Sequence, residues 1–182
     1  MTLMVIGILL WIGAHLFKRV MPEARAALGS KGQGLVAVTL LASVALMVVG
    51  YRAAPFVNVW FPPSYLTHVN NLLVLIGIWA MSPAGTKGML LSRVRHPMLM
   101  GFRLWAVAHL LVNGDMASIV LFGGLLIWGV VEVVVINRAE PDWTPRKDGS
   151  LAKDGMFFAA SIVLLAVIGY VHGLIGPSPF PG

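Results

Sequence analysis

Five histidines lie within or beside apolar stretches of the sequence, and these are the residues best suited to chemistry. They are His15, His68, His96, His109 and His172. A neutral imidazole can ligate a metal ion or a haem iron, although a single buried histidine more often hydrogen-bonds to a neighbouring helix. The chain has no cysteine, which excludes thiolate catalysis, disulfides and iron–sulfur clusters. Five histidines in one small protein therefore favour a ligand pair for a metal or a haem.

One predicted helix, over residues 97–113, concentrates the polar groups. At 3.6 residues per turn, His96 at its start and Arg103 share a face, whereas His96 and His109 lie on roughly opposite faces. Iron bound by His109 would therefore need its second ligand from another helix. Arg103 either pairs with Glu132 or holds an anionic ligand such as a haem propionate.

The elements that must position these groups are six apolar runs. Hydrophobic residues make up 58% of the 182 residues and charged residues 11%, against about 45–50% and about 25% in soluble domains. A membrane-spanning helix needs about 20 mostly apolar residues. We therefore predict an all-α integral membrane bundle of six transmembrane helices, which forms a single domain over 1–182 with a flexible Pro/Gly-rich end at 176–182. The runs cover 1–18, 35–52, 65–82, 97–113, 116–136 and 156–175.

The basic residues predict the orientation of this bundle. Eleven of the 13 lie between runs one and two, three and four, or five and six: Lys18, Arg19, Arg25, Lys31, Lys87, Arg93, Arg95, Arg138, Arg146, Lys147 and Lys153. Basic loops face the cytoplasm, so loops 18–34, 83–96 and 137–155 are expected there and both termini outside, in the bacterial inner membrane. Despite the net charge of +6, basic clusters between apolar runs indicate a lipid bilayer as the partner and not nucleic acid.

Two motifs carry a resemblance to a known family. The run from Arg95-His96-Pro97 to HLLVNGD at 109–115 resembles the NnrU family of membrane proteins, as does GAHLF at 13–17 followed by Pro22 and Arg25. Length and helix number also agree, so the resemblance covers essentially the whole chain. That family is linked to denitrification, near nitrite and nitric oxide reductase functions. Its plant and cyanobacterial relatives are the zeta-carotene isomerases, which bind haem b and isomerise a cis double bond.

The resemblance implies a cofactor and its ligands. His15 and His109 match the two haem-ligating histidines of the isomerases, and His96 matches a further histidine of the shared motif. It follows that the chain would bind haem b and act on an apolar isoprenoid by isomerase-like chemistry, or on nitric oxide in nitrogen-oxide metabolism.

The depth of each histidine in the membrane allows a second histidine pair as the haem ligands. If the first helix ends with its apolar run, His15 lies about 5 Å inside one membrane edge and His109 about 6–9 Å inside the other. The two depths agree better if the first helix continues to about Arg25. Otherwise the pair that agrees in depth is His68 with His109 or with His172.

Two other classes of function compete with a haem protein. Arg-His-Pro at a helix start is similar to a motif of membrane methyltransferases of the isoprenylcysteine and phospholipid types, which use S-adenosylmethionine. Glu140 follows the next helix, where those enzymes carry acidic residues, although they have a pair there and this chain has one. A non-enzymatic assembly factor, in which the histidines only pack, is the third class. A haem protein purifies coloured, and the other two do not.

Overall fold

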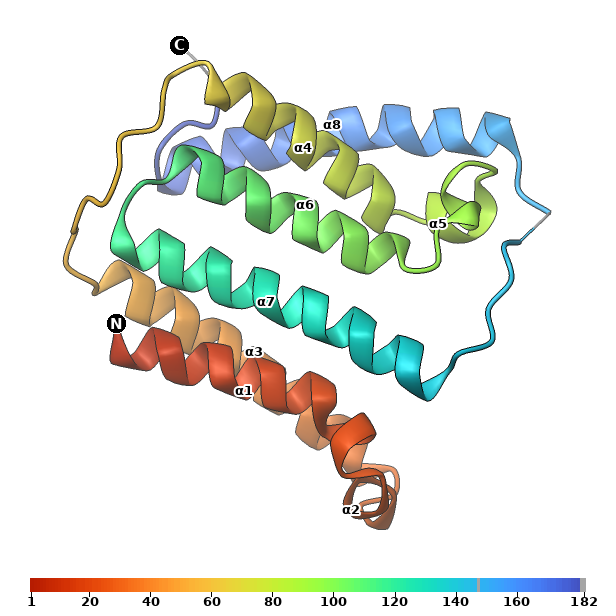
Figure 1. Cartoon of the computed structure of the whole chain (residues 1–182). Helices are drawn as coiled ribbons and strands as arrows, with labels where there is room; N and C mark the ends of the chain where they lie inside the picture. Colours follow the sequence, from red (N-terminus) through yellow and green to blue (C-terminus); the bar gives the residue numbers. More distant parts are fainter. Residues whose placement is uncertain (147, 181–182) are drawn as a thin grey trace. The chain divides into compact units, whose positions relative to one another are not determined.

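The structure, a computed structural model, describes residues 1–146 and 148–180, and every regular element in these residues is helical. Six longer helices alternate with short helical turns and loops (Figure 1). The longer helices are α1 (Thr2–Val20), α3 (Lys31–Arg52), α4 (Leu66–Met81), α6 (Pro97–Val112), α7 (Met116–Ala139) and α8 (Leu151–Ile175). The short ones are α2 (Pro22–Ala27), α5 (Ala84–Lys87) and the 3-10 turn η1 (Leu91–Arg93).

Each predicted apolar run coincides with one of the longer helices, so the all-α prediction is confirmed. Four of them, α1, α3, α7 and α8, are long and apolar enough to cross a membrane. The other two, α4 and α6, have 16 residues each, which corresponds to about 24 Å against a hydrocarbon core of about 30 Å. The six-span topology and the side of the termini remain predictions.

The first helix does not continue to Arg25. It ends at Val20, and Met21 adopts φ −130° and ψ 61° before α2 begins at Pro22. Proline disfavours a helical conformation in the residue before it and is itself well suited to a first helical position. The continuous first helix that would have brought His15 deeper is therefore wrong.

The chain divides into two compact units, of which the first comprises Met1–Trp60 and Gly114–Pro141. Here α1 packs against α3 and α7 (Figure 1). A Cβ atom on Gly7 would lie 2.7 Å from the Ser43 carbonyl oxygen of α3, so glycine permits the close approach of the two helices. The Tyr51 hydroxyl lies 2.8 Å from Ser118 Oγ, which joins α3 to α7.

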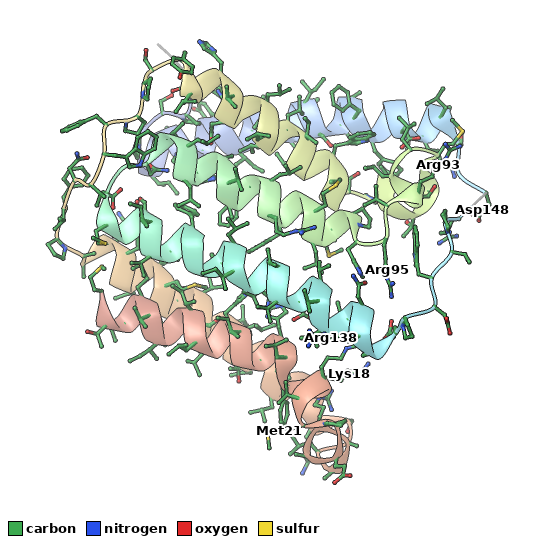
Figure 2. All side chains as sticks on the ribbon, in the orientation of Figure 1. Lys18, Met21, Arg93, Arg95, Arg138 and Asp148 are labelled. Carbon is green, nitrogen blue, oxygen red and sulfur yellow. The ribbon has the colours of Figure 1, made fainter. Side chains whose placement is uncertain are left out.

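At the other end of this unit, Arg19 Nη2 pairs with Glu140 Oε1 at 2.8 Å and so joins α1 to α7. Lys18 and Arg138 lie at this same end of the two helices (Figure 2).

The second unit comprises Phe61–Asn113 and Asp142–Gly182, of which residues 147, 181 and 182 are outside the described part. Helix α4 packs against α6 and α8 (Figure 1). A Cβ on Gly77 would lie 2.9 Å from the Gly101 carbonyl oxygen, so α4 and α6 also cross at small residues. Buried Ala80, Ala84 and Leu91 form a small core beside this crossing.

The chain end returns along α8 toward α4. The Asn71 side-chain amide donates to the Pro179 carbonyl oxygen at 3.0 Å, and the Phe180 ring lies over Gly169. The flexible end at 176–182 and the single domain over the whole chain remain predictions. Lys147, one of the basic loop residues, lies outside the described residues.

Candidate functional site

His15 belongs to an aromatic cluster between α1 and α7. Its Nδ1 donates to the Trp11 carbonyl oxygen at 2.9 Å, one turn earlier on the same helix. Its ring lies 4.4 Å from Trp11 and 4.5 Å from Trp128, between ring centroids. The two indoles meet edge to face at 5.3 Å, and Trp128 is 4% exposed. We call Trp11, His15 and Trp128 the α1–α7 aromatic cluster.

His109 is held in the same way on α6. Its Nδ1 donates to the Trp105 carbonyl oxygen at 2.9 Å, and the two rings lie 4.9 Å apart. Phe102 extends this row of tilted rings, with its ring centroid 5.3 Å from that of Trp105. The side-chain amide of Asn113 donates to the His109 carbonyl oxygen at 2.8 Å and closes the end of the helix.

These two hydrogen bonds fix the tautomer of both rings. A backbone carbonyl only accepts, so Nδ1 carries the hydrogen in each imidazole, and in a neutral ring Nε2 then carries the lone pair. Such an Nδ1–H···O=C bond is the usual outer-shell partner of a metal-ligating histidine, because it orients the ring and raises its basicity. The chemistry of His15 and His109 therefore fits ligation of a haem iron through Nε2.

Among the described residues, no three or more His, Cys, Asp or Glu side chains lie together in a group that could hold a metal ion. Two histidines suffice for a haem, because the macrocycle supplies the other four nitrogen ligands of its iron. His15 lies in the first unit and His109 in the second.

Arg103 in α6 and Glu132 in α7, each flanked by apolar residues, also lie in different units. Arg103 on α6 is half-buried, and its Nε donates to the Leu99 carbonyl oxygen at 3.1 Å. Glu132 on α7 is 9% exposed, and its Oε2 has no hydrogen-bond partner within the described part of the chain. Neither the ion pair between them nor the role of Arg103 beside a propionate is tested by this arrangement.

His96 lies where the sequence places it, at the start of a helix. It is the N-cap residue of α6, and its carbonyl oxygen accepts from the Met100 amide at 2.9 Å. Pro97 occupies the first helical position, where its missing N–H is no loss. The imidazole is thus at the loop end of α6, on the opposite end of the helix from His109.

The alternative histidines are in a different setting. His68 on α4 and His172 on α8 are both exposed. The Nδ1 of His172 donates to the Pro177 carbonyl oxygen at 2.7 Å, within the chain end. His15 and His109, by contrast, each lie against a tryptophan one turn away on the same helix.

Sequence reasoning missed Trp11 and Trp128 as parts of the site. One signal was available for Trp11, because tryptophan precedes histidine by four positions in both α1 and α6. No local pattern marks Trp128, which reaches His15 only because α7 packs on α1.

The fold defines a class of all-helical proteins whose longest helices have the length and composition of membrane spans. Within that class, the family model described as NnrU protein matches residues 3–179, nearly the whole chain. The chain belongs to the NnrU family, and the resemblance drawn from its motifs is confirmed. No curated protein and no solved structure matches it.

Proposed function

We propose that this chain is an integral membrane protein that binds haem b, and that His15 and His109 would ligate its iron. The observation that carries the proposal is the shared setting of the two imidazoles. Each donates Nδ1–H to the carbonyl oxygen of a tryptophan one turn earlier and lies against that indole with the two rings tilted. Of the five histidines, these two are the ones that match the haem-ligating residues of the family's isomerase relatives.

The residues divide the work of holding the macrocycle. Nε2 of His15 and of His109 would bind the iron, while Trp11, Trp105 and Trp128 exclude water beside the two imidazoles. Arg103 carries a positive charge on α6 that suits a propionate. His96, at the loop end of α6, is a further cofactor contact implied by the motif. When bound, the haem would supply an iron centre for nitric oxide or for the double bond of an apolar isoprenoid, and release of His15 or His109 would open the position that such a ligand takes.

This proposal places the protein in the bacterial inner membrane, with six spans and both termini outside. Its activity is then isomerase-like, or it serves nitrogen-oxide metabolism as in the family's link to denitrification. The four long apolar helices and the positions of the basic residues support this orientation.

The test is haem content after expression with ample haem supply. We expect purified wild type to be coloured and to give a b-type pyridine haemochrome. His15→Ala and His109→Ala should each lose most of the haem, whereas His68→Ala and His172→Ala should keep it. Every variant should still fold, because the apolar helices insert on their own hydrophobicity. Gel filtration in detergent checks this for each variant.

Two results contradict the proposal in different ways. A colourless wild type would remove haem and favour the methyltransferase or the assembly factor. Haem that survives loss of His15 but not loss of His68 or His172 would move the ligands to the histidine pair that agrees in depth.

A further inference from the structure

A cavity of about 370 Å³ lies in the second unit, at the end of α8 where the chain enters that helix. Two segments face each other across it. Met89 and Arg93 come from the turn that follows α5, and the other side comes from the segment that leads into α8. The complete lining is Met89, Arg93, Pro145, Arg146 and Gly149.

The two segments are joined by buried polar contacts. Asp154, 2% exposed in the first turn of α8, accepts from the amides of Met89 at 2.6 Å and Leu90 at 2.9 Å through Oδ2. The Ser150 amide donates to the Lys87 carbonyl oxygen at 3.1 Å. The backbone around the cavity is therefore held in place before any ligand arrives.

Gly149 allows the closest approach between these segments. A Cβ at this position would collide with the Gly88 carbonyl oxygen. Gly149 has no side chain, so its backbone itself forms part of the cavity wall.

Two guanidinium groups give the cavity its charge. Arg93 and Arg146 both line it and both are exposed. Arg146 also bonds to Asp148: its Nε donates to one carboxylate oxygen at 3.3 Å and its Nη2 to the other at 3.1 Å. This contact lowers the pKa of the Asp148 carboxyl and raises that of Arg146.

The segments that line the cavity also carry further positive charge and exposed apolar side chains. Residues 84–96 contain three basic residues and no acidic one. Arg93, Arg95 and Asp148 lie at the same end of the second unit, near α5 (Figure 2). Leu90 is 47% exposed, Trp143 40% and Leu151 58%. Exposed leucine and tryptophan beside arginine at the end of an apolar helix are typical of the membrane–water boundary.

We propose that Arg93 and Arg146 form a binding site for a phosphate group. Guanidinium presents paired N–H donors that match the oxygens of a phosphate, and charge-assisted bonds of this kind are stronger than neutral ones. Basic pockets at the cytoplasmic ends of membrane helices receive phospholipid headgroups. A phosphate free in solution has the same chemistry, so the source is decided by experiment. The site is separate from His15 and His109 and does not depend on haem.

The test uses full-length protein in detergent and native mass spectrometry. Phosphatidylglycerol is titrated against wild type and against the double variant Arg93→Gln, Arg146→Gln, with phosphatidylcholine as the neutral lipid. We expect the double variant to bind phosphatidylglycerol at least about tenfold more weakly, because it loses the charge-assisted bonds from both guanidinium groups to the phosphate oxygens. The control is Lys31→Gln with Arg138→Gln, which removes equal charge from the first unit and should change binding less than about twofold.

A third variant moves affinity in the opposite direction. Asp148→Asn removes the carboxylate that competes with a phosphate for the Arg146 guanidinium. This variant should therefore bind phosphatidylglycerol more tightly than wild type. Gain of affinity in this variant cannot come from misfolding. Gel filtration and thermal melting verify the fold of the double variant.

A parallel titration with inorganic phosphate identifies the source. Arginine-dependent binding of phosphatidylglycerol, with weak binding of inorganic phosphate, assigns the site to a lipid headgroup. Arginine-dependent binding of inorganic phosphate that phosphatidylglycerol does not displace assigns it to a soluble anion. Equal binding by wild type and the double variant, or an equal loss in the control, overturns the proposal.

Discussion

Single side chains decide how each imidazole is presented. The bond from Nδ1 to a carbonyl oxygen on the preceding turn sets the tautomer of His15 and of His109. The indole of Trp11 or Trp105 then limits ring rotation. A sequence can reveal the spacing of such a pair, but it does not show which nitrogen bears the hydrogen.

Arg103 should matter for haem retention less than His109 does. Arg103→Leu would remove the proposed charged contact to a propionate, worth about 1.5–3 kcal/mol, whereas His109→Ala would remove a proposed iron ligand. We expect Arg103→Leu to release haem to excess apomyoglobin about ten- to a hundredfold faster than wild type while it still purifies with haem. Arg103→Lys, which keeps the charge, should release it at an intermediate rate. Loss of haem as complete as in His109→Ala would make Arg103 essential and contradict the propionate role.

We expect Glu132 to lower the free energy of unfolding of the protein. A carboxyl oxygen that is buried without a partner forfeits its hydration, so replacing the side chain with an apolar one of similar volume removes that cost. We expect Glu132→Leu to raise the free energy of unfolding by about 1–3 kcal/mol, measured by thermal or denaturant unfolding in detergent.

Glu140→Gln is the matched control for this change, since its exposed ion pair with Arg19 contributes only about 0–1 kcal/mol. A marked loss of stability in Glu132→Leu would reveal a partner for that carboxylate and return the ion pair with Arg103 to consideration.

At the scale of the helices, small residues determine where two axes cross closely. Gly101 lies against the Gly77 backbone at the crossing of α4 and α6, where an added Cβ would meet the Gly77 carbonyl oxygen. Gly13 on α1 has no atom within 4 Å of an added Cβ. Identical substitutions at these two positions should therefore have opposite effects.

Gly101→Ala should lower the free energy of unfolding by about 1–3 kcal/mol, because a packed backbone must move apart. Gly13→Ala should leave it unchanged or raise it by up to about 1 kcal/mol, since alanine has the higher helix propensity. Thermal melting of both proteins in one detergent provides the comparison. Similar melting temperatures would show that α4 and α6 separate without cost.

The helices were predictable because their apolar runs are long, but their ends were less so. Helix α8 begins at Leu151, five residues before its predicted start, because Lys153 and Asp154 interrupt the apolar pattern in its first turn. Asp154 is buried there because it accepts hydrogen bonds from the Met89 and Leu90 amides, which lie 65 and 64 positions earlier in the chain. The contact of Trp128 with His15 was unpredictable for the same reason, since packing between distant segments creates it.

For the whole molecule, the charge of the loops predicts a topology that reporter fusions can check. Fusions after Lys31, Ser92 and Gly149 should report the cytoplasm, because 11 of 13 basic residues lie in those loops. Fusions after Val57 and at the C-terminus should report the outside. Two or more reversed positions would exclude the six-span arrangement.

The first unit is assembled from segments made at different times. Its α1 and α3 leave the ribosome early, whereas α7 follows only after α4 and α6 of the second unit have been synthesised. At about 5–20 residues per second, translation needs about 4–15 s to pass from α3 to Trp128. During that interval the nascent protein has His15 and Trp11 but lacks the third ring of the α1–α7 aromatic cluster. A ligand that needs all three rings can therefore be bound only after α7 has been synthesised, so loading of the proposed cofactor at His15 would be a late event in biogenesis.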